Sequence, residues 1–451
     1  MRVLVLEREP NLGGTTGIAV GSFTANRTSY QQRTGIEDDH VRHAEDVAKF
    51  ASPAVESRNN AELRRFFLQH TAETLEWLRG MGLVFHGPVP EPPNRVPRMH
   101  NVVPGAKAYI ATLHARLVRH GGVVVCGARV TNLFVEQGRV AGVVARCAGR
   151  EETCHARHGV VLAAGDYANS PDMIGQQFAA IEGVNPAATG DGHRLAESVG
   201  ARLVNMDLAN GPQIRFIAPA KKGLLDRLPV RLAAACLPLV PRPVLHALIK
   251  RILVVWQRPE SALFEDGAIL VNTRGDRFCD ETKTPDREIA LAQQPGKVGY
   301  ILLDEKLIAR YSVWPHFIST APEIAYAYVA DYLRLRPDVT VSGSSPAEVA
   351  RARGISGERL QTTVANGSLR GSRWLLLGPA KAYFTTTEGG AAVNEHLQVL
   401  DQDGQPIPGL YAVGQNGLGG MVLFGHGLHI AWALTSGRLA GLRLSRDFQR
   451  E

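Results

Sequence analysis

The sequence predicts an α/β fold in which strands alternate with helices and an inserted region separates the last elements from the rest. Residues 2–6 form a short apolar strand that ends at Glu7 and is followed by a Gly-Gly-Thr-Thr turn, as in the second strand of a nucleotide-binding βαβ unit. Residues 158–169 form a continuous apolar run that ends in small residues, which is typical of a buried parallel strand whose end meets a ligand.

The first region, residues 1 to about 212, contains the alternating elements. We expect Asn59 or Asn60 to cap a helix that Gly80 and Gly82 end. Its apolar positions keep helical spacing at Leu63, Phe66, Phe67, Leu75 and Leu78. A second helix is expected over residues 106–122. Two β-branched strands joined by a turn are expected to follow it, over residues 123–146.

Two further regions complete the predicted organisation. The middle region, residues 213–379, is expected to be an α+β domain with a hairpin over 267–278 and a pair of helices over 345–365. The last region, residues 380–451, returns to a hairpin and strand over 389–414 and closes with a long helix. The middle region would therefore interrupt a single α/β domain.

The positive charge of the chain is concentrated in one stretch. The formal net charge is +7, and residues 221–258 carry eight basic side chains against one acidic side chain, Asp226. Apolar rather than aromatic residues separate these charges, which argues against a nucleic-acid-binding surface. The apolar positions from Val244 to Leu253 fall on one helical stripe, so we expect a helix with an apolar and a cationic face. Such a helix fits ordinary packing on its neighbours, or contact with a membrane surface or a hydrophobic substrate.

Composition limits the class of protein and its compartment. With 451 residues and 45% hydrophobic content, the chain can bury one or two sizeable cores, which excludes a disordered or fibrous protein. The five cysteines form no CxxC pair and no Cys/His cluster at metal-ligand spacing, so we expect a reducing compartment and no metal site. The apolar run before Glu7 is too short for a signal peptide. We therefore predict a cytoplasmic location, with membrane association through residues 221–258 as an open alternative.

Six strings occur in an order that resembles a known group of flavoproteins. They are LVLEREPNLGGTTGIAVGS, VVLAAGDYANSPDM, ATGDGHRLAESVGA, GAILVNTRGDRFCDE, GISGERLQTTVA and VLDQDGQPIPGLYAVG, the last followed by SGRLAG. Together they resemble the FAD-dependent fumarate reductases, succinate dehydrogenases and ketosteroid dehydrogenases over nearly the whole chain. The resemblance implies a Rossmann-like FAD-binding domain that lacks its first βα unit and is interrupted by an α+β capping domain, with catalysis at their interface.

The residues expected to bind FAD follow from chemistry and from this resemblance. Glu7, at the end of a second strand, is the natural acceptor for the hydroxyls of the adenosine ribose. Gly13 and Gly14 let the backbone approach a diphosphate or flavin edge, and Thr15 and Thr16 offer hydroxyl and amide donors. The resemblance adds a further set of positions: Gly21, Ser22, Val130 by backbone contact to adenine, Ala164, Gly165, Asp191, Gly414, and Gln415 in place of the family's glutamate.

The start of the final helix is expected to face the flavin. By resemblance, the amides of His429 and Ile430 contact the pyrimidine ring, where the positive end of the helix dipole stabilises reduced flavin. No histidine lies between Gly13 and Ser22, so the covalent flavin attachment of respiratory members is not expected. FAD should be bound non-covalently.

The chain departs from the family at the residues that bind dicarboxylates. The two family histidines fall at Gly211 and Thr386, the arginine acid falls at Pro285, and a second arginine falls at Gly417 or Phe424. An unpaired dianion in a closed site costs several kcal/mol. We therefore favour a neutral, hydrophobic carbonyl substrate such as a ketosteroid over fumarate or succinate, the alternative reading.

Hydride transfer across a CH–CH bond next to a carbonyl needs a proton donor or acceptor beside the flavin. Tyr383, His426 and Arg287 are the candidate catalytic residues, with His426 favoured over His429 because the amide of His429 is already assigned. No NAD site is evident, so the electron acceptor is left open. The partners expected are a small-molecule substrate and this acceptor, and no nucleic acid.

The opening of the sequence raises a further expectation. The first strand, its GxGxxG loop and the following helix, about 30 residues, would precede the strand at residues 2–6. We therefore expect Met1 to be an internal methionine. If it is the true start, the chain would be a flavin-fold protein with impaired FAD binding, which is the other reading of its function.

Overall fold

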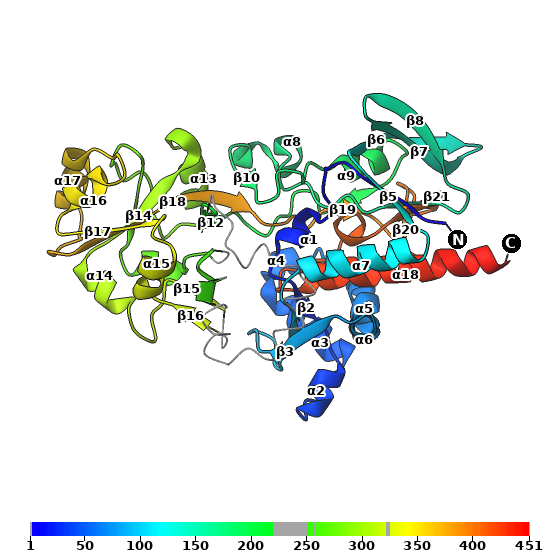
Figure 1. Cartoon of the computed structure of the whole chain (residues 1–451), viewed down its shortest axis with the longest axis horizontal. Coiled ribbons are helices and arrows are strands. Elements are labelled where there is room, and N and C mark those ends of the chain that lie inside the picture. Colours follow the sequence, from blue (N-terminus) through cyan, green and yellow to red (C-terminus); the bar gives the residue numbers. More distant parts are fainter. Residues whose placement is uncertain (1, 220–249, 252, 256–257, 322–324, 451) are drawn as a thin grey trace.

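The computed structural model describes residues 2–219, 250–251, 253–255, 258–321 and 325–450, with side chains described up to residue 446. Two bodies are joined by crossing strands (Figure 1), and each has its own hydrophobic core. We refer to the body that carries both chain ends as the first body and to the other as the cap.

The first body is built around two short parallel pairings. Strand β1 (Leu4–Glu7) pairs with β5 (Val123–Cys126), and β9 (Val160–Leu162) pairs with β21 (Pro406–Ala412) in a sheet completed by β20 (Gln398–Leu400). In the described part of the chain, β1 and β9 are each paired along one edge only. The predicted α/β fold with a Rossmann-like first body is confirmed in this form.

Other sheets of the first body are antiparallel. Residues 123–146, expected to form two strands, are interrupted at Gly127, which at φ +70° ends β5 and restarts the chain in a new direction. Three strands follow β5, and the last of them lies beyond the predicted range. They form one sheet in the order β6 (Ala128–Glu136), β7 (Arg139–Cys147) and β8 (Arg150–His155). A second sheet has the order β2 (Ser22–Thr24), β4 (Met99–Val103) and β3 (Val84–Val89), and β11 (Leu203–Val204) pairs with β19 (Gly390–Ala391).

The helices of the first body confirm most of the predicted ones. The helix expected to end at Gly80 is divided into α5 (Ala61–Gln69) and α6 (Thr71–Gly80), because His70 leaves helical geometry. Asn60 caps α5 through its side chain, as predicted. The helix expected over 106–122 is α7 (Lys107–Arg119), and the long final helix is α18 (Leu428–Arg450) (Figure 1). The other described helices of the first body are α1 (Gly14–Ile18), α2 (Ser29–Arg33), α3 (His40–Val47), η1 (Ala48–Phe50), α4 (Pro53–Glu56), α9 (Asp191–Glu197) and η6 (Gly414–Gly417).

The cap is organised around the long strand β18 (Trp374–Phe384). Its neighbours are β10 (Glu182–Gly183), β12 (Gln213–Phe216), β14 (Gly299–Leu303) and β17 (Thr340–Gly343), and β13 (Ile269–Val271) pairs with β14. The pair of helices predicted over 345–365 is present as α16 (Pro346–Arg351) and α17 (Gly357–Ala365). The hairpin predicted over 267–278 is reduced to one bridge, between Val271 and Arg277.

Smaller elements complete the cap, and its core extends beyond the predicted boundaries. They are α8 (Pro171–Ile174), η2 (Gln176–Phe178), α12 (Ser261–Glu265), α13 (Asp286–Ala292), η5 (Pro295–Lys297), α14 (Glu305–Arg310), β15 (Ser319–Ala321), β16 (Ala325–Ala327) and α15 (Val329–Leu335). Tyr167 and Ile181, from the first predicted region, pack in the cap core. The boundary predicted after residue 379 falls inside β18, which continues to Phe384.

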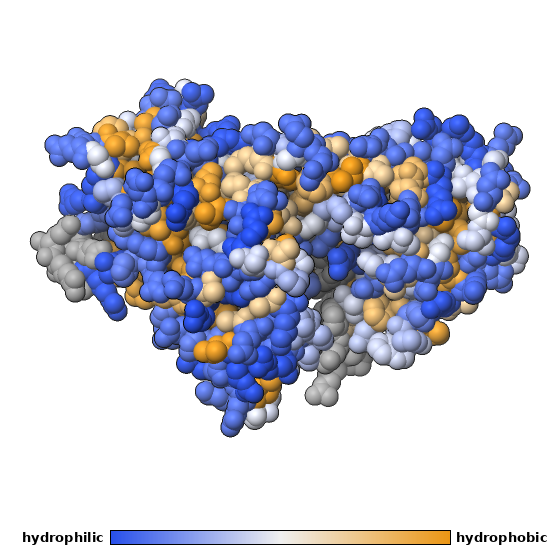
Figure 2. Space-filling model, turned by 180° about the vertical axis from the view of Figure 1, so that it is seen from behind, coloured by the Kyte–Doolittle hydropathy of each residue, from blue (hydrophilic) through white to orange (hydrophobic). Residues whose placement is uncertain are grey.

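The amphipathic helix predicted around Val244 lies outside the described residues, apart from its last positions. Among the helices that are described, none is long and apolar enough to cross a membrane. On the face opposite to that of Figure 1, polar side chains predominate and apolar ones form separate patches (Figure 2). That face therefore carries no continuous apolar belt.

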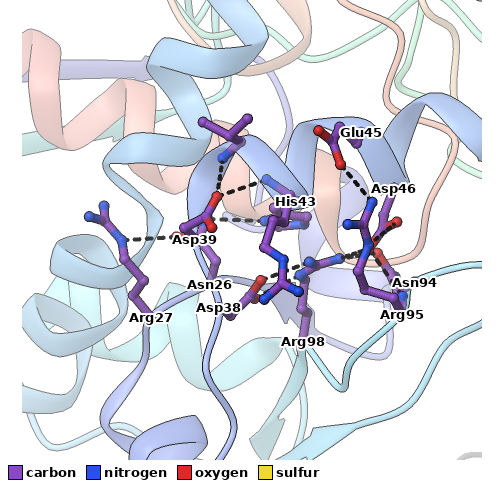
Figure 3. A network of polar contacts seen from close by, with 12 residues as sticks. Asn26, Arg27, Asp38, Asp39, His43, Glu45, Asp46, Asn94, Arg95 and Arg98 are labelled. Atoms are coloured by element: carbon purple, nitrogen blue, oxygen red, sulfur yellow. Dashed lines mark hydrogen bonds and ion pairs between the residues drawn. The ribbon is translucent and has the colours of Figure 1, made fainter.

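A buried ion network fixes the loop that precedes β4 (Figure 3). Arg98 is fully buried and donates hydrogen bonds at 2.8 Å to Asp38 and at 2.7 Å to Asp46, two carboxylates that are also buried. Burial acts to raise the pKa of Asp46, but hydrogen bonds from Lys49, Arg95 and Arg98 hold it well below its usual range. Asp46 is therefore charged, and Arg98 bonds to both buried carboxylates at once.

We predict that Arg98→Met lowers the free energy of unfolding by about 3–5 kcal/mol, because it leaves Asp38 and Asp46 buried without their shared cation. Urea unfolding followed by circular dichroism would measure the change. Arg146→Met is the matched control, since Arg146 and its partner Glu151 are both mostly exposed, and should change stability by less than about 0.5 kcal/mol. Equal effects of the two substitutions would contradict the prediction.

Candidate functional site

A cleft of about 3170 Å³ runs between the first body and the cap. It is lined by β1, the glycine loop after it, the end of β9 and the start of α18, and on the cap side by β12 and residues 335–338. All fifteen residues predicted to bind the cofactor line it: Glu7, Gly13, Gly14, Thr15, Thr16, Gly21, Ser22, Val130, Ala164, Gly165, Asp191, Gly414, Gln415, His429 and Ile430. The structure therefore brings together residues that lie up to about four hundred positions apart in the sequence.

The glycines of the cleft wall leave room for a ligand. The predicted Gly-Gly-Thr-Thr turn is instead the first turn of the short helix α1, which Gly13 enters at φ +144°. At Gly14 and Gly165, both at positive φ, nothing lies within 4 Å of the position that a Cβ would take. A side chain at either position would therefore occupy cleft space, which fits a backbone cradle for a bulky cofactor. Gly21 differs, since a Cβ there would lie 2.6 Å from the Val102 side chain, and packing alone requires it.

The charged residues at the other end of the cleft are partly bound to one another. Glu7 accepts a hydrogen bond at 2.8 Å from the amide of Glu9. Asp191 is held in ion pairs by Arg8, at 2.9 Å, and by Arg129, at 3.3 Å. Arg8 and Arg129 also line the cleft, and the sequence analysis did not identify them. The signal for Arg8 was its place directly after Glu7, at the end of the strand.

The start of α18 faces the cleft and is backed by a buried polar group. The amides of His429 and Ile430 belong to its first turn, where a helix leaves amides without acceptors of its own. The ring of His429 contacts Gln415 Oε1 through Nδ1 and Glu388 Oε1 through Nε2, each at 2.9 Å. The Gln415 amide also donates to the Thr387 carbonyl at 2.8 Å, so this side chain is bonded within the protein.

Burial and charge shift the pKa values of two of these groups. Burial acts to lower the pKa of His429, but the charge and hydrogen bond of Glu388 and the charge of Asp166 raise it, and the balance is a raised pKa. Burial raises the pKa of Asp166 to about 6, against a hydrogen bond from the Ala168 amide and the charge of His429. Perturbed groups of this kind in a cleft mark it as a functional site.

Of the three predicted catalytic residues, one lies in the cleft. The side chain of His426 is 73% exposed, and its Nδ1 contacts Glu91 Oε1 at 2.5 Å, while the His426 amide donates to the same oxygen at 2.9 Å. Glu91 is 8% exposed and also lines the cleft. The sequence analysis did not identify Glu91, since a single carboxylate in the proline-rich run PVPEPP gives little signal.

Tyr383 and Arg287 are not among the residues that line the cleft. Tyr383 lies on β18 between Gln213 and Glu182, and burial raises its pKa. Arg287 is buried against the ring of Phe264 and binds Glu288 at 2.5 Å. The guanidinium of Arg287 is thus engaged in the cap core, so its position does not support the predicted catalytic role.

Three of the positions where the family carries dicarboxylate-binding residues and this chain does not are Thr386, Gly417 and Phe424. Thr386 lines the cleft, and its hydroxyl accepts from the Gln415 amide. At Gly417 a Cβ would lie 2.3 Å from the carbonyl oxygen of Ala412, so the backbone leaves no space for a side chain. Of the two possible positions of the second arginine, only Phe424 lines the cleft.

The fold and the glycine-lined cleft define a two-body protein that binds a dinucleotide-type cofactor between its bodies. The family model described as FAD binding domain matches residues 1–225 and 377–424, and the chain belongs to this family. Its cofactor is FAD, as predicted, and its class is that of the FAD-dependent oxidoreductases that act on CH–CH groups.

Curated relatives align over most of this chain. The fumarate reductase (cytochrome) of Shewanella frigidimarina is 25% identical over 98% of this chain and 72% of its own length. The NADH:fumarate oxidoreductase of Klebsiella pneumoniae is 24% identical over 97% of this chain, which spans 44% of that protein.

Solved structures show the same fold. The open conformation of a flavocytochrome c3 fumarate reductase matches with a TM-score of 0.72 at 23% identity, covering 98% of this chain and 74% of the other. The 3-ketosteroid Δ1-dehydrogenase of Sterolibacterium denitrificans matches with a TM-score of 0.65 at 17% identity, covering 99% and 95%.

We predict that Gly165→Ala weakens FAD binding about tenfold or more, because its methyl group would enter the cleft, while Gly149→Ala leaves FAD binding unchanged. Both glycines have positive φ and open space around the Cβ position, so each substitution should cost about 1–2 kcal/mol of stability. Gly149, in the turn after β7, does not line the cleft. Fluorescence titration with FAD and urea unfolding would separate the two effects. Equal FAD affinities in the two variants would contradict this use of Gly165.

Proposed function

We propose that this protein catalyses FAD-dependent hydride transfer across a CH–CH bond of a neutral, hydrophobic carbonyl substrate such as a ketosteroid. The argument against a dicarboxylate is the chemistry of the four family positions, which here are Gly211, Pro285, Thr386, and Gly417 or Phe424. None of these side chains carries a positive charge, and a substrate dianion would lack compensation there. The fumarate reductases among the relatives keep a dicarboxylate as the competing candidate.

The observation that carries the proposal is the exposed ring of His426, held by a nearly buried carboxylate in the cleft at the head of α18. Glu91 Oε1 accepts from the His426 amide, so it acts as an acceptor toward the ring as well. This makes Nδ1 of His426 the donor and leaves Nε2 as the atom that can take a proton from substrate or return it.

The roles of the chain's own residues follow from this arrangement. FAD, when bound, accepts or supplies the hydride. His426 moves the proton at the neighbouring carbon through Nε2, and Glu91 keeps the ring in one tautomer and one orientation. The amides of the first turn of α18 offer positive partial charge to groups in the cleft. The residues that would hold FAD are the fifteen that line the cleft, with Gly14 and Gly165 as the open backbone positions.

Two predictions from the sequence remain predictions. They are the cytoplasmic location and the contact of residues 221–258 with a membrane surface. A small-molecule acceptor would need to reach the cleft, whose walls belong to both bodies.

Anaerobic reduction of the FAD-loaded protein tests the proposal. The visible flavin spectrum would be recorded after addition of ketosteroids, succinate or dithionite. We expect bleaching by a saturated ketone or ketosteroid and no bleaching by succinate. Bleaching by succinate would overturn the substrate class. A protein that takes up no FAD would support the alternative reading as a flavin-fold protein without catalysis.

We predict that His426→Gln lowers kcat by about 10²–10⁴-fold with little change in FAD affinity, because it removes the proton-transferring group and leaves the cleft intact. Steady-state kinetics with the substrate found above would measure it. His114→Gln, an exposed histidine on α7, is the control and should keep full activity. Unchanged kcat in His426→Gln would exclude His426 as the acid or base.

A further inference from the structure

Three polar side chains, those of His429, Glu388 and Gln415, form a hydrogen-bonded group behind the first turn of α18. Its centre is His429, whose side chain is 20% exposed, and whose partner Glu388 is fully buried. Gln415 completes the group from the other side of the ring. His429 and Gln415 line the cleft, whereas Glu388 is not among the lining residues. Glu388 therefore reaches the cleft only through His429.

The hydrogen bonds around Gln415 decide where the protons lie. The carbonyl of Thr387 can only accept, so the Gln415 nitrogen must donate to it and the Gln415 oxygen must face His429. Nδ1 of His429 must then carry a hydrogen. One further proton lies between Nε2 of His429 and Glu388, at 2.9 Å. This leaves two states, an imidazolium with a carboxylate or a neutral ring with a protonated acid.

The second oxygen of Glu388 favours the charged state. It accepts a hydrogen bond at 2.8 Å from the amide of Leu423, which stabilises a carboxylate. We propose that Glu388 is a positioning residue that holds the second proton on His429, so that a permanent imidazolium faces the cleft where FAD binds. The proposal rests on FAD binding and is independent of the identity of the substrate.

The surroundings of His429 allow this charge to act on the cofactor. Among the described residues, the other titratable group whose charge acts on it is Asp166, a buried acid that lines the cleft. A cation fixed behind the helix N-terminus adds to the positive end of the helix dipole. Reduced flavin carries more negative charge than oxidised flavin, so the imidazolium binds the reduced form more tightly.

Glu388→Gln tests the proposal with little change in shape. A glutamine can accept from the Leu423 amide and donate to Nε2 of His429, so both hydrogen bonds are kept, while His429 loses the partner that holds its second proton. We expect the ratio of affinities for reduced over oxidised FAD to fall about tenfold, which for a two-electron couple lowers the midpoint potential by about 30 mV. Spectroelectrochemical titration would measure the potential.

Nitrogen NMR of the histidine rings in the FAD-free protein gives an independent readout. In the wild type, both nitrogens of His429 should carry hydrogens at pH 7, and in Glu388→Gln only Nδ1 should. The signal is assigned by its loss in His429→Asn. Asp172→Asn removes an exposed carboxylate that does not line the cleft, and should change neither the protonation of the His429 ring nor the potential.

The outcomes separate cleanly. A neutral His429 ring in the wild type at pH 7 would overturn the proposal, and this measurement does not require any Glu388 variant to fold. An imidazolium in the wild type with an unchanged potential in Glu388→Gln would also overturn it. Reduction by succinate or failure on ketosteroids would overturn only the proposed substrate class, because the potential and the ring state do not depend on it.

Discussion

The hydrogen bonds between Gly414 and α18 hold the site together. The Gly414 amide donates to the hydroxyl of Ser436 at 2.9 Å, and the Gly414 carbonyl accepts from the indole of Trp432 at 3.0 Å. Both backbone groups at the end of β21 are thus bound to side chains of one helix, and Trp432 is fully buried against Phe67. This junction helps to hold the first turn of α18 at the cleft, together with the packing of α18 on β2 and α6.

A second set of contacts positions the candidate acid and base from the opposite side. Arg98 anchors the loop before β4 to Asp38 and Asp46 in the interior. The same loop carries Glu91, which binds His426 through both ring and backbone. A fully compensated ion network of this kind is costly to break, and it defines one conformation of the loop. The geometry of His426 therefore depends on an interaction with none of its atoms in the cleft.

Local sequence signals indicated the fold class, and together with the resemblance to known flavoproteins they pointed to the residues that line the cleft. The strand ending at Glu7, the glycines after it and the small residues after β9 are local patterns, and they occupy one cleft. The structure differs from the predicted elements where a single residue redirects the chain, as Gly127 does after β5 and His70 does between α5 and α6. Propensity over a window does not register such single changes.

The candidate catalytic and positioning residues were harder to predict because their partners are distant in the sequence. Glu91 lies 335 positions from His426, and Glu388 lies 41 positions from His429, in stretches without any motif. Arg287 had a suggestive place in the sequence, but its guanidinium is bound in the cap by Glu288 and by the Glu281 carbonyl. Contacts between distant side chains form only in the folded chain, so they produce no periodic pattern in the sequence.

The crowding at Gly417 has a consequence for how this site could evolve. Because the carbonyl of Ala412 would lie 2.3 Å from any Cβ there, an arginine cannot be restored at that position by one codon change without rebuilding η6. Of the two positions that the second family arginine could occupy, only Phe424 lines the cleft, so a cation substituted there would face it. The backbone around Gly417 therefore restricts any change of charge at this part of the cleft wall to residue 424.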